Sequence, residues 1–211
     1  MKKEQRLITR FRQRSLPFWP EGYPQIDWDQ LFAMQHFGIP TRLLDWTENA
    51  VVATYFASDH DQSRCECGTN SCKPTLWVLD PVQLNRLNSR LEGYGEAISV
   101  LATSDDAIEP WAPGTEDTRF APWPIAIYGT HNSSRIVAQQ GTFTVAGKED
   151  KALDAVPAVA DNHGVLEKIL IDIEHPELMK ELKILGVTRG TVFPDLTGLS
   201  DDITTAELGD G

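Results

Sequence analysis

The 211-residue sequence lacks the features that mark several common protein classes. No apolar run approaches the roughly 20 residues that a membrane-spanning helix needs, so we expect neither a membrane span nor a membrane partner. The basic start is not followed by the apolar stretch of a secretory signal. The motifs G-x-x-x-x-G-K-[ST], G-x-G-x-x-G, G-x-S-x-G and H-E-x-x-H are absent, which disfavours P-loop, Rossmann, α/β-hydrolase and zincin chemistry.

Basic residues are scarce relative to acidic ones, with 19 Lys and Arg against 31 Asp and Glu and a net charge of −12. A charge of that sign repels phosphate backbones, so we expect no default binding to nucleic acid. Six of the basic residues lie within the first 14 positions, a pattern typical of a solvated helix face.

Cysteine is also rare, with three residues in total. An odd number of cysteines without an export signal indicates a reducing, cytoplasmic compartment. Together with a histidine they form the pattern H-x4-C-x-C-x4-C, from His60 through Cys65 and Cys67 to Cys72. Four nitrogen and sulfur ligands would suit tetrahedral zinc, but the spacing is not the usual C-x-x-C. The motif therefore has two interpretations, a zinc site or an ordinary cysteine-bearing surface loop, and its spacing favours the loop.

Hydrophobic periodicity predicts helices and strands that alternate irregularly along the chain. The predicted helices are 4–14, 28–37, about 48–58, 81–90 and 175–186. The predicted strands are 75–80, 124–129, 141–147 and 166–173, with a strand end and turn at 188–196. This pattern favours an α+β fold in a single domain, with helices packed on a mixed or antiparallel sheet.

The same pattern sets the expected limits of that domain. We expect an N-terminal helix and Pro-rich connector over 1–27, the domain over 28–199 and a flexible polar tail over 200–211. Two helix starts have candidate caps: Asp27 for the helix at 28–37, and Asp45 or Thr47 for the helix at 48–58. The second of these helices is apolar almost all round and should lie inside the domain.

Four blocks of the sequence resemble the FRG domain family. The first is FAMQHFGIPTRLLDWTENAVVATYFAS, and the later ones are WVLDPVQLN, RIVAQQGTFTVAG and LGVTRGTVFPDLTGL. They occur in the family's order and cover most of the chain from about residue 28 to 199. The Phe-Arg-Gly tripeptide that names the family is absent, since Phe11-Arg12 is followed by Gln13. Two explanations stay open: a start that lies inside the domain, or a natural relative without that strand.

The resemblance implies an ADP-ribosyltransferase-like domain of a bacterial toxin or phage-defence system, with NAD as a possible co-substrate. In that enzyme class a Ser/Thr-bearing strand and a helix form the nicotinamide pocket, and a late Glu or Gln orients the ribose. The resemblance places Asp45, Trp46 and Thr47, with Tyr55 on the following helix, in the middle element. The other class that stays open is a non-catalytic binding module or a degenerate remnant, which the missing tripeptide favours.

Arg42 and its neighbours have two interpretations. Arg42 could bind a phosphate while Trp46 and Thr47 line a nicotinamide pocket, since Trp supplies a flat apolar wall with one N–H donor. Alternatively, Asp45 caps a helix, Arg42 pairs with an acid and Trp46 fills the core.

Polar residues elsewhere complete the candidate site. His36 could act as a general acid or base or donate to substrate, or it could simply complement a helix C-terminus. Gln139 and Gln140, with Arg135 nearby, could accept hydrogen bonds from ribose hydroxyls and position the sugar as an oxocarbenium-like centre develops. A structural role for these amides, satisfying loop backbone, is the alternative.

Overall fold

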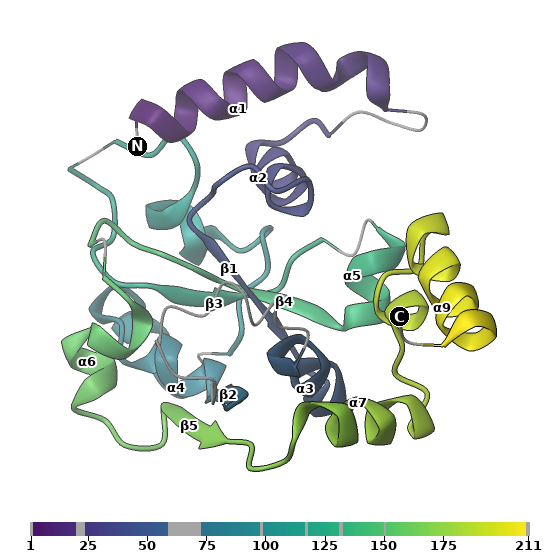
Figure 1. Ribbon diagram of the computed structural model, residues 1–211. Helices are drawn as coiled ribbons and strands as arrows, with labels where there is room; N and C mark the ends of the chain where they lie inside the picture. The colour runs from purple at the N-terminus through teal and green to yellow at the C-terminus, as the bar shows by residue number, and fades with distance from the viewer. Residues whose placement is uncertain are drawn as a thin grey trace. The chain divides into compact units, whose positions relative to one another are not determined.

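The computed structural model describes residues 2–19, 24–58, 73–97, 99–116, 118–130, 133–149 and 151–209. It is a mixture of helices and antiparallel strands, which confirms the predicted α+β class (Figure 1). The chain divides into two compact units, of which the first comprises Met1–Asp45, Asp80–Thr130 and Thr142–Val165. The second comprises Trp46–Leu79, His131–Gly141 and Leu166–Gly211. The domain limits expected near residues 28 and 199 stay a prediction.

The first unit is built on short helices and a sheet of order β1-β4-β3. Its strands are β3 (Ile125–Ile127) and most of β4 (Gly141–Val145), together with the start of β1 (Leu43–Thr47). Its helices are α1 (Lys2–Ser15), η1 (Leu16–Phe18), α2 (Asp27–His36), α4 (Pro81–Arg86), η3 (Ser89–Ala97), η4 (Asp106–Trp111), η5 (Leu153–Ala155) and α6 (Pro157–Ala160). β3 and β4 are antiparallel, with Ile127 opposite Phe143.

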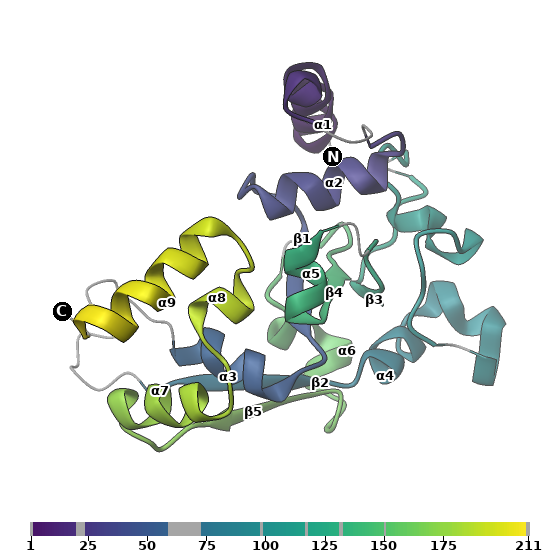
Figure 2. The same ribbon diagram turned by 90° about the vertical axis from the view of Figure 1, so that its right-hand side faces the viewer.

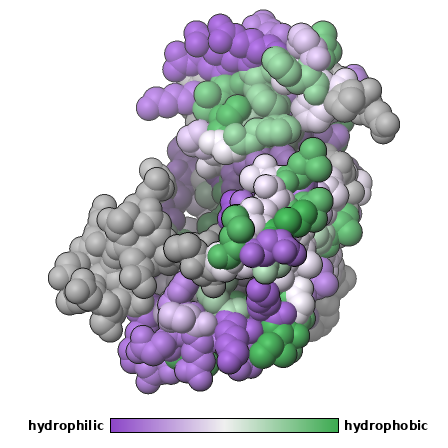
Figure 3. Space-filling model, turned by 45° about the vertical axis from the view of Figure 1, so that its right-hand side comes forward, coloured by the Kyte–Doolittle hydropathy of each residue, from purple (hydrophilic) through white to green (hydrophobic). Residues whose placement is uncertain are grey.

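The core of the first unit lies between α2, β3 and β4. Phe32 of α2 packs on Phe143 of β4 with ring centroids 4.9 Å apart, and both side chains are almost fully buried. α1 packs against α2 and pairs with it through Arg12 and Asp27, so one of its basic residues has a partner (Figure 1). The outer side of α1 is hydrophilic, as the purple band along the top of Figure 3 shows.

The long stretch between α4 and β3 also contributes to this core. It contains the short helices η3 and η4, and Trp111 at the end of η4 is fully buried. The Trp111 indole Nε1 donates to the carbonyl of Trp123 at 2.7 Å, so its one polar group is satisfied.

The second unit holds a separate two-stranded antiparallel sheet and five helices of the described chain. Its elements are α3 (Ala50–Ser58), β2 (Thr75–Leu79), α5 (Ser134–Gln139), β5 (Leu166–Leu170), α7 (His175–Ile184), α8 (Arg189–Val192) and α9 (Leu196–Leu208). Its core joins Tyr55 of α3, Leu178 and Leu182 of α7, and Val192 of α8. α3 lies beside α7, and α8 lies beside α9 (Figure 2).

Two predicted helix caps are wrong. α3 begins at Ala50 because β1 continues through Thr47, and Asn49 caps it by accepting from the backbone N–H groups of Val51 and Val52 at 3.0 and 3.3 Å. Asp27 is the first residue of α2, and Ile26 takes the N-cap position. α3 also does not lie wholly inside, since Phe56 on it is exposed.

The C-terminal block differs most from expectation. A strand end and turn were predicted at 188–196, but this stretch contains the helical turn α8 and the start of α9. Thr188 caps α8 in a reciprocal capping box with Thr191, and the Asp195 side chain caps α9 by accepting from the Gly198 N–H at 2.8 Å. α9 runs to Leu208, so residues 200–208 are helical rather than a frayed tail. In the described part of the chain, no helix has the length and apolar character to cross a membrane.

The buried Asn85 fastens α4 to the sheet of the first unit. Its Nδ2 donates to the carbonyls of Ser99 and Ala126 at 2.9 and 3.0 Å, and its Oδ1 accepts from the Ala126 N–H at 2.8 Å. Replacing it by an apolar residue would leave three backbone groups without their partner, two of them on the buried Ala126.

We expect Asn85→Leu to lower the free energy of unfolding by about 2–4 kcal/mol, because a buried donor or acceptor left unsatisfied costs about 1–3 kcal/mol. Urea titration followed by far-UV circular dichroism measures the change. Asn162→Ala is the matched control, since within the described residues the exposed Asn162 amide bonds only to the Ala158 carbonyl four residues before it. A loss for Asn85→Leu no greater than for the control would contradict this assignment.

Candidate functional site

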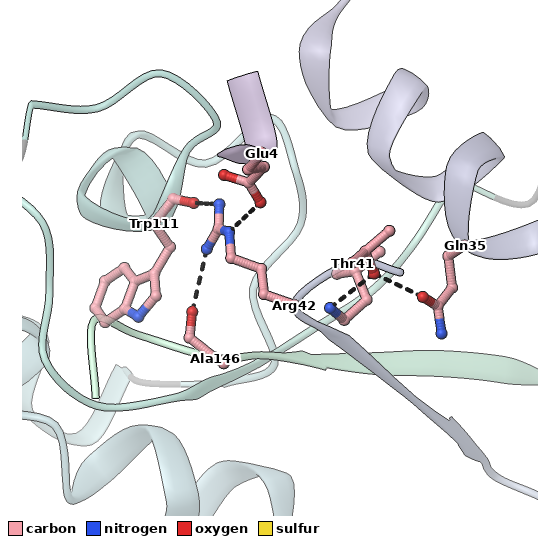
Figure 4. Close-up of polar contacts among 7 residues, drawn as sticks. Glu4, Gln35, Thr41, Arg42, Trp111 and Ala146 are labelled. Atoms are coloured by element: carbon pink, nitrogen blue, oxygen red, sulfur yellow. Dashed lines mark hydrogen bonds and ion pairs between the residues drawn. The ribbon is translucent and has the colours of Figure 1, made fainter. Parts of the chain in front are cut away.

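Arg42 is the most heavily bonded of the predicted site residues, and it lies inside the first unit (Figure 4). Its Nε donates to Glu4 Oε1 of α1 at 2.6 Å, and its Nη1 donates to the carbonyl of Ala146 at 3.2 Å. Its Nη2 donates to the carbonyl of Trp111. The side chains of Arg42 and Glu4 are only 14% and 13% exposed.

Aromatic rings complete the enclosure of this guanidinium. Its central carbon lies 5.0 Å from the ring centroid of Phe120 and 5.8 Å from that of Trp28. Burial lowers the pKa of Arg42, and the neighbouring Glu4 carboxylate partly offsets that effect by favouring the charged form. Arg42 therefore pairs with an acid, as the structural interpretation predicts, and its N–H groups tie together α1, η4 and the residue after β4. A phosphate-binding role for Arg42 stays a prediction.

A second polar chain runs beside Arg42. The Thr41 hydroxyl donates to Gln35 Oε1 at 2.6 Å (Figure 4). Gln35 Nε2 donates in turn to Asp45 Oδ2 at 2.7 Å. Asp45 is exposed on strand β1 and caps no helix, which corrects the structural interpretation of this residue. His36 follows Gln35 and lies edge-on to Phe37, with ring centroids 4.8 Å apart. Gln35 is a residue that the motif analysis missed, although it stands next to His36.

Gln139 and Gln140, the residues predicted to position the ribose, lie beside Thr47 and Glu48 in the second unit. The Thr47 hydroxyl donates to the carbonyl of Gln139 at 2.6 Å, and the Glu48 N–H donates to the carbonyl of Gln140 at 3.1 Å. Gln139 Nε2 donates to the carbonyl of Val192 at 3.1 Å. Three of the blocks that resemble the family, separated by about 90 and 50 residues, thus converge on one short segment.

Gln140 has an unusual backbone conformation. It ends helix α5 with φ 47° and ψ 50°, and it is the one non-glycine residue of the described chain with positive φ. This left-handed region costs a residue with a Cβ roughly 1–2 kcal/mol. The Gln140 side chain is exposed, and within the described chain no group bonds to its amide or to Gln139 Oε1. Hydrogen-bonding groups of both glutamines are therefore available to a ligand.

Other predicted residues take different positions in the second unit. Arg135, at the start of α5, holds its guanidinium 4.7 Å from the ring centroid of Phe193. Trp46 is half-buried on β1. Tyr55 is packed in the core of this unit and only 3% exposed, and its place in a cofactor pocket stays a prediction.

The possible zinc ligands His60, Cys65, Cys67 and Cys72 lie outside the described residues. Within the described ranges, no group of three or more His, Cys, Asp and Glu side chains could hold a metal ion.

Residues 1–65 match the family model of the FRG domain. The match confirms the resemblance over the first block, and it begins before residue 28, where the sequence led us to place the domain start. It contains α1, α2, β1 and α3, and therefore both Glu4 and Arg42. No curated protein and no solved structure matches the chain.

We expect Glu4→Gln to lower the free energy of unfolding by about 2–4 kcal/mol, because it leaves the buried Arg42 cation without its counter-charge. Urea unfolding measures the loss. The control is Glu109→Gln, which removes the exposed pair between Glu109 and Arg119, with a 2.9 Å distance, and should cost at most about 1 kcal/mol. Equal losses in the two variants would show that the Arg42 pair is no stronger than a surface ion pair.

Proposed function

We propose that this FRG-domain chain binds a nicotinamide dinucleotide through its second unit and acts as an ADP-ribosyltransferase-like domain, in the setting of a bacterial toxin or phage-defence system. Two findings support the proposal. Residues 1–65 match the FRG family model, and the contacts among Thr47, Gln139 and Gln140 join the elements that the resemblance assigns to one pocket.

The observation that carries the proposal is the backbone of Gln140. Glycine would occupy a left-handed position at the end of a helix without the penalty that a Cβ brings, and glycine is the usual residue there. In this chain a glutamine occupies the position, with its side chain exposed. Local strain of this kind is concentrated at binding and catalytic sites, where the surrounding structure maintains it.

The chemistry available to these residues is positioning. Gln139 Oε1 and the Gln140 amide would bond to the hydroxyls of the nicotinamide ribose, and Trp46 would provide an apolar wall. In the transfer step, the bond between ribose C1′ and the nicotinamide nitrogen breaks, and nicotinamide leaves with the bonding electron pair. An acceptor oxygen or nitrogen then bonds to C1′ and releases its proton to solvent.

A non-catalytic binding module is the second candidate. Thr47, Gln139 and Gln140 cannot act as general bases near neutral pH, and the Thr47 hydroxyl already donates to the Gln139 carbonyl. A site of this composition could hold a dinucleotide without turnover. Chromatography that detects nicotinamide released from NAD separates the two candidates. A binding module would bind NAD but would release no nicotinamide from it.

The test of the pocket is Gln140→Gly. We expect the unfolding free energy to stay equal or rise by up to about 1 kcal/mol, because glycine relieves the left-handed strain. We expect NAD affinity to fall about tenfold, measured by calorimetric titration, because the ribose loses a hydrogen-bonding partner.

Gln13→Gly in the exposed part of α1 is the matched control. It should cost about 1 kcal/mol of stability as an ordinary helix-interior glycine and leave NAD binding unchanged. Absence of NAD binding by the unmodified chain at millimolar concentration would refute the proposed function. Unchanged affinity in a folded Gln140→Gly variant would remove Gln140 from the site.

A further inference from the structure

Two arginines of the second unit converge on one aromatic ring. The guanidinium carbon of Arg135 lies 4.7 Å from the ring centroid of Phe193, and that of Arg189 lies 5.1 Å from the same centroid. The ring itself is held by Phe56, whose ring meets it edge-on at a centroid distance of 5.8 Å. Both guanidinium groups therefore lie against one fixed surface.

The backbone around Arg189 and Phe193 is tightly constrained. Asp202 Oδ2 accepts from the Thr188 hydroxyl at 2.6 Å and from the Gly190 N–H at 3.1 Å, which fixes α8 against α9. A Cβ at Gly190 would lie 2.4 Å from Asp202 Oδ2, and a Cβ at Gly198 would lie 2.2 Å from the Phe193 carbonyl oxygen. The clash at Gly198 is with backbone, so only glycine fits there, and a Cβ at Gly190 would displace the Asp202 carboxylate that holds α8.

The charges at this ring are only partly balanced. Arg189 Nε lies 2.6 Å from Asp201 Oδ2, but the two side chains are 42% and 47% exposed, and such pairs contribute about 0–1 kcal/mol. Arg135 has no carboxylate partner among the described residues. Two like charges near one ring repel each other. Acidic residues outnumber basic ones in this chain of net charge −12, so composition alone does not account for two neighbouring arginines.

We infer that Arg135 and Arg189 bind the diphosphate group of a nucleotide ligand across Phe193. Guanidinium groups suit phosphate oxygens because their N–H donors are planar and can bond in pairs. A diphosphate would balance both cations, and it would compete with Asp201 for Arg189.

The inference deepens the proposed function and rests on it for the identity of the ligand as a dinucleotide. Arg135 and Gln139 are four residues apart on α5, so they share one face of that helix. Gln139 is also bonded to Val192, the residue before Phe193. One short helix thus carries both the proposed phosphate-binding residue and the proposed ribose-binding residue.

The test uses calorimetric titration of the full chain with inorganic pyrophosphate and, separately, with NAD. We expect Arg135→Gln to weaken both interactions at least tenfold and to reduce their dependence on salt concentration. Asp201→Asn should act in the opposite direction and strengthen pyrophosphate binding severalfold, because it removes the competing carboxylate. A merely structural function of these side chains would not produce opposite signs.

Lys168→Gln is the control for net charge. Lys168 lies on β5 of the same unit, with its Nζ 5.4 Å from the ring centroid of Trp77, so the variant also removes a cation from an aromatic ring. It should leave both affinities unchanged. Circular dichroism confirms that each variant is folded before it is titrated.

The outcomes separate the inference from the proposed function. If NAD binds equally well to the unmodified chain and to Arg135→Gln, the diphosphate site is overturned while the dinucleotide proposal survives. If pyrophosphate binds in an Arg135-dependent way but NAD does not bind, the anion site stands and the dinucleotide proposal fails. If pyrophosphate does not bind the unmodified chain, or if Asp201→Asn weakens its binding, the inference is wrong.

Discussion

The first unit depends on one buried cation. Arg42, the residue before strand β1, meets the carboxylate of Glu4, two backbone carbonyls and two aromatic rings (Figure 4). A guanidinium so removed from water is stable only because these partners replace its hydration. The same contacts help to explain how α1, a helix of mostly polar residues, is held on the unit although it buries little apolar surface: Ile8 is its one buried hydrophobic residue in the described structure.

The second unit depends on capping and close approach rather than on a buried charge. Its C-terminal block folds through the side chains of Thr188, Asp195 and Asp202, each of which accepts from a backbone N–H at the start of α8 or α9. Glycines at the contact let α8 and α9 approach closely. That precision matters for the two arginines beside Phe193, because a phosphate-binding pair must be presented in a fixed arrangement.

Sequence patterns predicted the elements whose signal is local. The strands at 75–79, 125–127, 141–145 and 166–170 follow from β-branched and apolar runs, and helix α4 follows from Pro81 at its first turn. The short helix α8 was missed because one helical turn leaves no periodicity, and its signal was the pair of threonines that cap it. The partner of Arg42 was equally hidden, since Glu4 lies 38 positions earlier and no local rule joins them. The left-handed Gln140 could not be predicted either, because the glycine that usually takes this conformation follows it directly.

The interleaving of the two units along the chain constrains how the protein is made. Each unit is assembled from three separate stretches, so no single cut in the chain isolates either one. During synthesis, the first stretch of each unit emerges long before its last, which begins at Thr142 in one case and at Leu166 in the other. Apolar side chains such as Tyr55 and Phe32 therefore leave the ribosome well before all of their core partners exist. Neither core can close until its last stretch has been made, and the apolar segments that are made first stay exposed until then.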